Sequence, residues 1–499
     1  MASQVKLLPA KCALDIGDGS ERGEYVSQQY ILNVLGRPHR AVNIMYTYYP
    51  HDKYWPARIS EACADMDVSS AWGYPYDDYY PFCEGGKQFE QMRDIRRHGQ
   101  DVMLTITTDC SLTDDEIRDF VRQLIPFGRM MLRINHECNG SWFTHNKRFS
   151  YEEVAAFFVR FAAIVRKEAP NIRTVFCAGL AGETDEEFIE KKDIIDNFER
   201  EFAAKGDPEK VEKEDVFAAA YAAADIWSAD KYTALHYGWP YDTAEPGILT
   251  YDINPPERLF ERYKRTYDRL EKLFGPKPLI QAEFNADGDV TGPLSQGEMI
   301  ARYYNAVSGN EASYIKGISM YQFRDRGRLG LEIEDPSDPS TGIRQPVLDE
   351  YLKILSDPYF LPRFESGPEV SYPATLRWGG SEDADGLQIP VKLEKTPSFC
   401  EVMLPKQLSL MIEFNGRWFY KAAGVECVDL MGAFFDRPLE GAANIPLRIF
   451  ATPPDGENHD DGNENWRCDQ YYVINSEPQM RIRYETPLSV FVRDSLPQQ

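Results

Sequence analysis

From about residue 40 to 355, the sequence alternates short runs of β-forming apolar residues with longer segments of helical period. Such alternation predicts a parallel sheet, because each helix carries the chain back across the sheet to start the next strand. Eight units of this kind close most simply as a (β/α)8 TIM barrel. A doubly wound open sheet is the alternative, disfavoured because no Gly-x-Gly-x-x-Gly segment follows the first predicted strand. The predicted strands are residues 41–49, 66–74, 101–108, 129–137, 173–180, 230–237, 277–284 and 314–323.

Two of the intervening helices have recognisable starts. Ser150 with Glu153, and Ser295 with Glu298, match the Ser-x-x-Glu capping box. In this motif the serine and glutamate side chains bond the free amides of a helix N-terminus. Both serines therefore predict the first residue of a helix.

The pattern changes after Pro358, where helical periodicity stops and short β-rich runs lie between turn residues. This change predicts two domains, a catalytic (β/α)8 barrel at residues 1–360 and an all-β, sandwich-like accessory domain at residues 365–499. The accessory domain could bind a ligand of its own or only support the barrel. We favour a supporting role, because Trp418 lies in a run whose aromatic and apolar neighbours suit a core. If the domain binds a ligand, the candidate aromatic platforms are Trp378, Trp418 and Trp466.

Charge and hydropathy exclude several partners. The 55 Lys and Arg against 80 Asp and Glu give a net charge of −25, which repels nucleic acid. No run of about 18 apolar residues is present, so no membrane partner is expected. The start of the chain lacks the apolar core of a secretory signal. We therefore expect a cytoplasmic protein, or a secreted one whose signal has been removed.

The sequence also argues against a structural zinc site. Seven histidines and nine cysteines are scattered without His-Glu-x-x-His or Cys-x-x-Cys spacing. Because the cysteines are also far apart and odd in number, reduced thiols are favoured over a disulfide framework.

Two glutamates lie at the carboxyl ends of predicted strands, where the active sites of such barrels are found. Glu137 ends the fourth predicted strand and Glu283 ends the seventh. Side chains alternate along a strand, so Arg133 is expected to share the face of Glu137, and Gln281 that of Glu283. Two facing carboxyl groups suit the cleavage of a glycosidic bond, in which one protonates the leaving oxygen and the other captures the anomeric carbon.

The segment RINHECNGSWF, residues 133–143, resembles the acid/base motif of glycoside hydrolase family 26, a clan A family that contains β-mannanases. The resemblance implies a retaining barrel enzyme with Glu137 as its general acid/base. Cys138 replaces the usual Met, and we expect it to be a small buried residue. The matching residues are His136, Glu137, Asn139, Gly140, Trp142 and Phe143.

The segment Ala282-Glu283-Phe284 is similar to the nucleophile segment of the same family, which implies that Glu283 is the nucleophile. Asn285 stands where a glycine is usual. Tyr237 is similar to the tyrosine that hydrogen-bonds the nucleophile, and Trp239 follows it. The strand LTITTD lacks the histidine expected in a mannanase.

These features predict a retaining β-glycoside hydrolase acting on mannan-, glucan- or xylan-type β-linked oligo- or polysaccharides through two glutamates, without a cofactor. The alternatives are a non-catalytic carbohydrate-binding protein on the same barrel and, more weakly, a divalent metal held by the carboxylates and His136. The sugar, its linkage, endo or exo action and the oligomeric state stay open. The predicted substrate-binding residues are Arg133, His136, Asn139, Trp142, Tyr237, Trp239, Trp72 and Tyr321.

Overall fold

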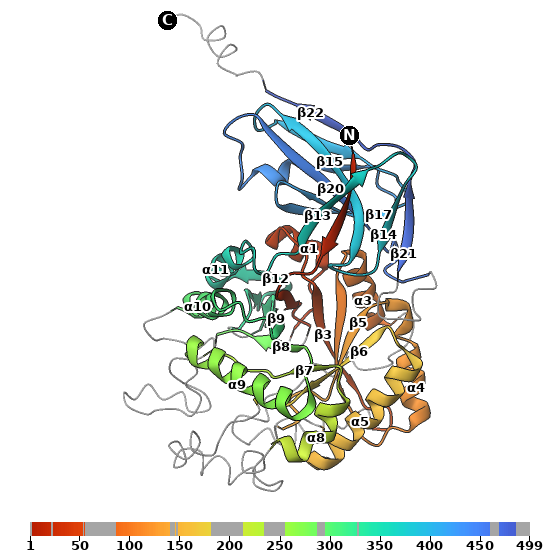
Figure 1. The fold of residues 1–499 in the computed structure, drawn as a ribbon, viewed down its shortest axis with the longest axis vertical. Helices are drawn as coiled ribbons and strands as arrows, with labels where there is room; N and C mark the ends of the chain where they lie inside the picture. Colours follow the sequence, from red (N-terminus) through yellow and green to blue (C-terminus); the bar gives the residue numbers. More distant parts are fainter. Residues whose placement is uncertain are drawn as a thin grey trace, which may run out of the picture.

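A computed structural model describes the fold at residues 2–20, 23–52, 54, 86–139, 145, 148–180, 213–233, 255–286, 295–326, 329–459 and 469–485. The lower part of Figure 1 is a closed barrel whose strands pair in parallel from β2 to β9. The predicted TIM-barrel fold is therefore confirmed. Its strands are β2 (Ala13–Gly17), β3 (Ala41–Tyr48), β4 (Asp101–Thr108), β5 (Met130–Ile134), β6 (Ile172–Cys177), β7 (Ile226–Ser228), β8 (Leu279–Phe284) and β9 (Ile315–Met320).

The barrel helices pack their apolar faces on these strands. Both predicted capping boxes are present, since Ser150 is the N-cap of α5 and Ser295 that of α10, and the Glu153 and Glu298 side chains accept from the N–H groups of these serines. After β9 comes a small sheet of β10 (Arg324–Asp325), β11 (Glu332–Asp335) and β12 (Asp338–Arg344). The helices are α1 (Gln28–Leu35), α3 (Lys87–Arg97), α4 (Asp114–Arg122), α5 (Tyr151–Glu168), α8 (Lys213–Ala223), α9 (Pro256–Phe274), α10 (Gln296–Gly309) and α11 (Val347–Ile354).

Two of the predicted barrel strands are corrected. The first barrel strand is β2, which the sequence reading missed, and β3 pairs directly with β4. The predicted strand at 66–74 lies outside the described residues. The sixth strand is β7 at Ile226–Ser228, four residues before the predicted start at 230. The strand before Glu137, β5, and the strand that carries Glu283, β8, nevertheless keep their places as fourth and seventh in the barrel.

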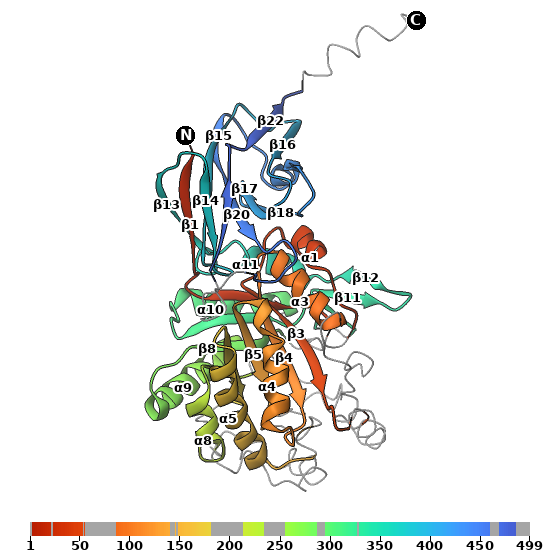
Figure 2. The same ribbon diagram turned by 90° about the vertical axis from the view of Figure 1, so that its right-hand side faces the viewer.

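The other part of the molecule is antiparallel and consists of two sheets (Figure 2). Their facing sides enclose an apolar core, which includes Leu387 and Ile412 from the larger sheet and Val402 from the smaller one. This is the sandwich-like arrangement expected from the β-rich runs. The larger sheet contains β1 (Ser3–Leu8), β13 (Arg363–Glu369), β14 (Ala374–Trp378), β15 (Ala384–Leu393), β17 (Ser409–Phe414), β18 (Arg417–Lys421), β20 (Ala443–Thr452) and β21 (Gln470–Ile474), and the smaller one β16 (Phe399–Met403), β19 (Cys427–Asp429) and β22 (Gln479–Arg483).

The N-terminal strand β1 belongs to this larger sheet, where it pairs with both β13 and β15. Residues 3–8 therefore lie in the β-rich part, although the barrel follows them in the chain. The domain limits of 1–360 and 365–499 stay a prediction.

Two predicted glycan platforms are buried between the β-rich part and the barrel. Trp418 stacks near Phe450 at 5.8 Å between ring centroids, and its backbone N–H donates to the Gly36 carbonyl at 2.8 Å. Trp378 lies 4.2 Å from the Arg96 guanidinium, a cation–π contact. Both indoles are less than 10% exposed, so neither is a surface platform. The third candidate, Trp466, lies outside the described residues.

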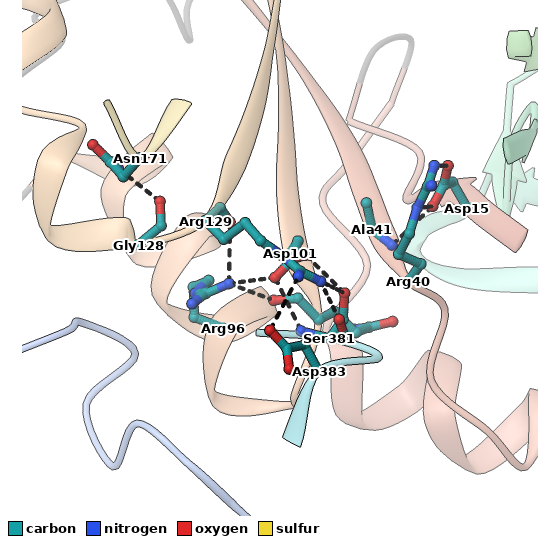
Figure 3. A network of polar contacts seen from close by, with 11 residues as sticks. Asp15, Arg40, Ala41, Arg96, Asp101, Gly128, Arg129, Asn171, Ser381 and Asp383 are labelled. Carbon is teal, nitrogen blue, oxygen red and sulfur yellow. Dashed lines mark hydrogen bonds and ion pairs between the residues drawn. The ribbon is translucent and has the colours of Figure 1, made fainter. Parts of the chain in front are cut away.

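A polar network joins the two parts at the end of the barrel where the strands begin (Figure 3). Asp101, the first residue of β4, accepts from Arg96 at 2.6 Å and from Arg129 at 2.8 Å. The hydroxyl of Ser381, from the β-rich part, donates to the same carboxylate at 2.8 Å. The β-rich part is therefore fixed to the barrel face opposite the strand ends that carry Glu137 and Glu283.

Glu382 follows Ser381 in this interface and is only 8% exposed. It lines a cavity of about 40 Å³ with Arg37, His39 and Arg40. The guanidinium of Arg40 is paired with Asp15, and Glu382 has no hydrogen bond or ion pair with any described residue. Burial raises the pKa of Glu382 to about 7. The charge of Arg40 opposes this rise, and the charge of Asp15 adds to it.

Glu382→Gln should stabilise the protein at pH 8 but not at pH 4. The folded pKa of about 7 exceeds the ordinary value of 4.5, so the folded state binds the proton more tightly. The stability that this tighter proton binding contributes is fully present below pH 4.5 and is lost as the pH rises through 7. The gain at pH 8 should approach about 3 kcal/mol in denaturant unfolding. Glu365→Gln, on the exposed strand β13, is the control. A gain that does not change with pH would contradict this explanation.

Among the described residues, no helix combines the length and the apolar character that crossing a membrane requires.

Candidate active site

The site is built around the buried guanidinium of Arg133, on β5. Its Nη1 donates to Asp230 at 2.6 Å and its Nη2 to Glu283 at 2.5 Å. Its Nε donates to the Thr105 hydroxyl at 2.8 Å. All three partners are buried, so these contacts are desolvated and charge-assisted. The negative charges of Asp230 and Glu283 outweigh the effect of burial and raise the pKa of Arg133 well above its ordinary value.

The same network extends to both sides. The Thr105 hydroxyl donates to Asn43 on β3 at 2.8 Å. The Cys177 thiol, at the end of β6, donates to Asp230 at 3.3 Å. One connected set of side chains therefore links β3, β4, β5, β6 and β8 with the segment that follows β7.

Glu283 reaches this network through an irregularity in β8. The pairing with β9 shifts between Gln281 and Phe284, as at a β-bulge. Ile280 and Ala282 pack inside the barrel with Met131, whereas Phe284 packs against the helices. Glu283 points inward with Arg133 because the bulge breaks the alternation. The prediction that Gln281 shares its face with Glu283 is wrong for this reason.

Glu137 reaches the site through a turn. Strand β5 ends at Ile134, and Asn135 and Glu137 have left-handed φ values of 46° and 47°. Asn135 turns toward β4, where its Oδ1 accepts from the Thr108 N–H at 2.7 Å. The expected strand through residue 137, with Arg133 and Glu137 on one regular face, is therefore wrong, although the two residues do meet in one site. Cys138 is buried, as predicted.

The carboxyl groups converge. One carboxylate oxygen from each of Glu137, Asp230 and Glu283 lies within 4.8 Å of the others. Like charges at this distance repel, so a proton retained within the group is favoured. Burial and the charge of Glu283 raise the pKa of Asp230 in spite of Arg133.

His136 lies beside Glu283, with 3.8 Å between its Nε2 and the Glu283 Oε1. Burial, with smaller effects from Arg133 and His145, lowers the pKa of His136 well below 6.5. The imidazole is therefore neutral, the form expected for a residue that holds a sugar hydroxyl.

Sequence reasoning missed two members of the site, Asp230 and Tyr232. The Tyr232 hydroxyl donates to the Glu283 Oε2 at 3.0 Å. This is the contact predicted for Tyr237, which lies outside the described residues. Both missed residues follow the apolar run of β7 directly. Placing the strand on Ile226–Ser228 would have put them at its carboxyl end.

Some of the other predicted substrate-binding residues lie within the described part of the chain, and the rest lie outside it. Arg133 is completely buried and bonds protein groups, which corrects the expected substrate contact to a supporting one. Asn139 accepts from the Gly179 N–H at 2.7 Å, and Tyr321 is 3% exposed beneath Tyr232. The predictions for Trp72, Trp142 and Trp239 lie outside the described residues.

The three acids form the one cluster of the described chain whose spacing would also suit a metal ion. The cation would have to share Asp230 and Glu283 with the Arg133 guanidinium. This competition disfavours a metal at the site.

No family model and no curated protein matches the chain. Among solved structures, it is similar to a double mutant of a Cellulomonas fimi endo-beta-1,4-mannanase at 12% identity and a TM-score of 0.42, over 94% of each chain. It is also similar to the catalytic domain of a Bacillus sp. JAMB-750 GH26 endo-beta-1,4-mannanase at 12% identity and a TM-score of 0.41, over 70% of this chain and 86% of that one.

A Thermotoga maritima beta-glucosidase is similar at 10% identity and a TM-score of 0.42, over 70% of this chain and 98% of that one. All three of these structures are of glycosidases, and two of them are of mannanases.

Tyr232→Phe should lower turnover of an aryl glycoside about 10- to 100-fold, the effect of losing one hydrogen bond to a charged group. The fold should persist, because the ring contact with Tyr321 needs no hydroxyl. Initial rates and circular dichroism would measure both. Tyr237→Phe, made in parallel, tests the residue predicted from sequence. A larger loss in that variant would contradict the assignment to Tyr232.

Proposed function

We propose that the protein is a retaining β-glycoside hydrolase in which Glu137 is the general acid/base and Glu283 is the nucleophile. The observation that carries the proposal is the separation of less than 4.8 Å between their nearest oxygens. Inverting enzymes keep their carboxyl groups roughly 6.5–9.5 Å apart to admit a water, whereas retaining enzymes need about 5–5.5 Å. The distance supports double displacement.

In the first step, Glu137 protonates the glycosidic oxygen while a Glu283 oxygen attacks the anomeric carbon. The bond from that carbon to the leaving oxygen breaks, and a glycosyl ester on Glu283 forms. Arg133 and Tyr232 orient the Glu283 carboxylate for attack, since each donates to a different one of its oxygens. Two bonds of this kind limit its rotation.

In the second step, Glu137, now ionised, takes a proton from water. The water oxygen attacks the anomeric carbon from the side that the leaving group left. The ester bond breaks, and the Glu283 carboxylate is restored. Two inversions give a product of retained configuration.

The substrate class we propose is a β-linked oligo- or polysaccharide of the mannan, glucan or xylan type. Its support is the motif at 133–143 and the neutral His136 beside the nucleophile. Hydrolysis of 2,4-dinitrophenyl β-glycosides of mannobiose, cellobiose and xylobiose by the wild-type protein tests the class. Lack of turnover of all three would reject the proposal.

Glu137→Ala should slow substrates with poor leaving groups far more than dinitrophenyl glycosides, whose phenolate barely needs a proton. Azide needs no general base and should fill the space left by the carboxylate, giving a β-glycosyl azide of retained configuration. Product configuration is read by NMR.

Glu283→Ala should give the opposite stereochemistry, because azide then attacks the face that Glu283 normally occupies. Glu283→Gln, the shape-matched control, should bind ligand but lose nearly all turnover. A retained azide from Glu283→Ala, or an inverted one from Glu137→Ala, would mean that the two roles are exchanged.

A further inference from the structure

Asn285 follows the nucleophile by two residues and is completely buried. Its Nδ2 donates to the Tyr321 carbonyl at 2.7 Å and to the Leu329 carbonyl. Its Oδ1 accepts from the Ala286 N–H at 2.7 Å. The side chain thus ties the end of β8 to the two segments that follow β9. A glycine at this position could make none of these bonds.

The backbone of Asn285 makes a further connection, to the segment after β7. Its carbonyl accepts from the Thr233 N–H at 3.0 Å. Thr233 directly follows Tyr232, whose hydroxyl donates to Glu283. Asn285 therefore holds the chain on one side of the tyrosine that binds the nucleophile.

The segment after β7 and the segment after β9, both bonded to Asn285, meet through two tyrosine rings. The rings of Tyr232 and Tyr321 pack edge to face, with 5.7 Å between centroids and 87° between planes. The Tyr321 carbonyl is fixed by the Asn285 side chain, and Tyr321 in turn supports the Tyr232 ring. One residue thus acts on both tyrosines.

We propose that Asn285 is a positioning residue that holds Tyr232, directly and through Tyr321, in hydrogen-bond contact with Glu283. This inference rests on the proposed function, because it concerns the nucleophile of that reaction. Without the Asn285 amide, the Tyr321 segment loses the bond at its carbonyl and keeps only the one from its N–H to the Phe284 carbonyl, so the Tyr232 hydroxyl moves away from the carboxylate. The two catalytic glutamates, Glu137 and Glu283, stay in place.

The test compares Asn285→Ala with Asn171→Ala. Asn171 is equally buried and donates to the Gly128 carbonyl at 2.7 Å, at the opposite end of the barrel (Figure 3). Both variants lose a buried amide that bonds backbone carbonyls, so both should lower the melting temperature. Only Asn285→Ala should lower kcat, by about 10- to 100-fold, with KM changed less than about threefold. Its crystal structure should show the Tyr232 to Glu283 distance lengthened beyond hydrogen-bond range, against 3.0 Å in the wild type.

A second variant keeps the test decisive if Asn285→Ala does not fold. Like Asn285→Ala, Asn285→Gly retains the backbone carbonyl bond to Thr233 and loses only the side-chain bonds. It should therefore show the same fall in kcat. An unchanged kcat and distance in a folded Asn285 variant would overturn the proposal, as would an equal fall in kcat in Asn171→Ala. If the wild-type protein cleaves no glycoside, the proposed function fails, and the distance in the crystal structures alone decides the role of Asn285.

Discussion

The buried guanidinium of Arg133 is the interaction on which the rest of the site depends. A charge that is fully removed from water must be paired, and Arg133 is paired by Asp230 and Glu283 from two other strands. Leaving such partners unpaired costs on the order of 3–5 kcal/mol. The position of Arg133 therefore fixes both acids, and through Thr105 and Asn43 it extends to β3. The backbone pairing of the strands sets their order, and the contacts of Arg133 set the geometry of the acids.

This charge also determines the state of the groups around it. With burial, the positive guanidinium keeps the neighbouring His136 neutral, since two cations so close in a dry site would repel. Three acids face one arginine, so their charges are not balanced by Arg133 alone, and a proton is favoured among them. A neutral imidazole and a protonated acid beside an arginine-bound carboxylate are the states that acid-assisted glycoside cleavage requires.

Much of this arrangement follows from sequence patterns, and the exceptions have local causes. Alternation predicts the barrel and places Glu137 and Glu283 correctly at the fourth and seventh strands. Strand β7 has only three residues, too few for a periodic signal, so Asp230 and Tyr232 were not recognised as strand-end residues. The left-handed turn at Glu137 and the bulge before Glu283 re-aim both side chains. Backbone irregularities of this kind leave no apolar period, so a strict alternation rule cannot find them.

The β-rich part acts on the site through the strands that it anchors. Ser381 binds Asp101 at the start of β4, and Arg129, one residue before β5, binds both Asp101 and the Ser381 carbonyl. The same two strands carry Thr105 and Arg133 further along. A shift of either strand start would move these side chains, because a paired strand transmits displacement along its length. The contacts of Ser381 and Arg129 thus hold the starts of two strands whose side chains are used at the opposite end of the barrel.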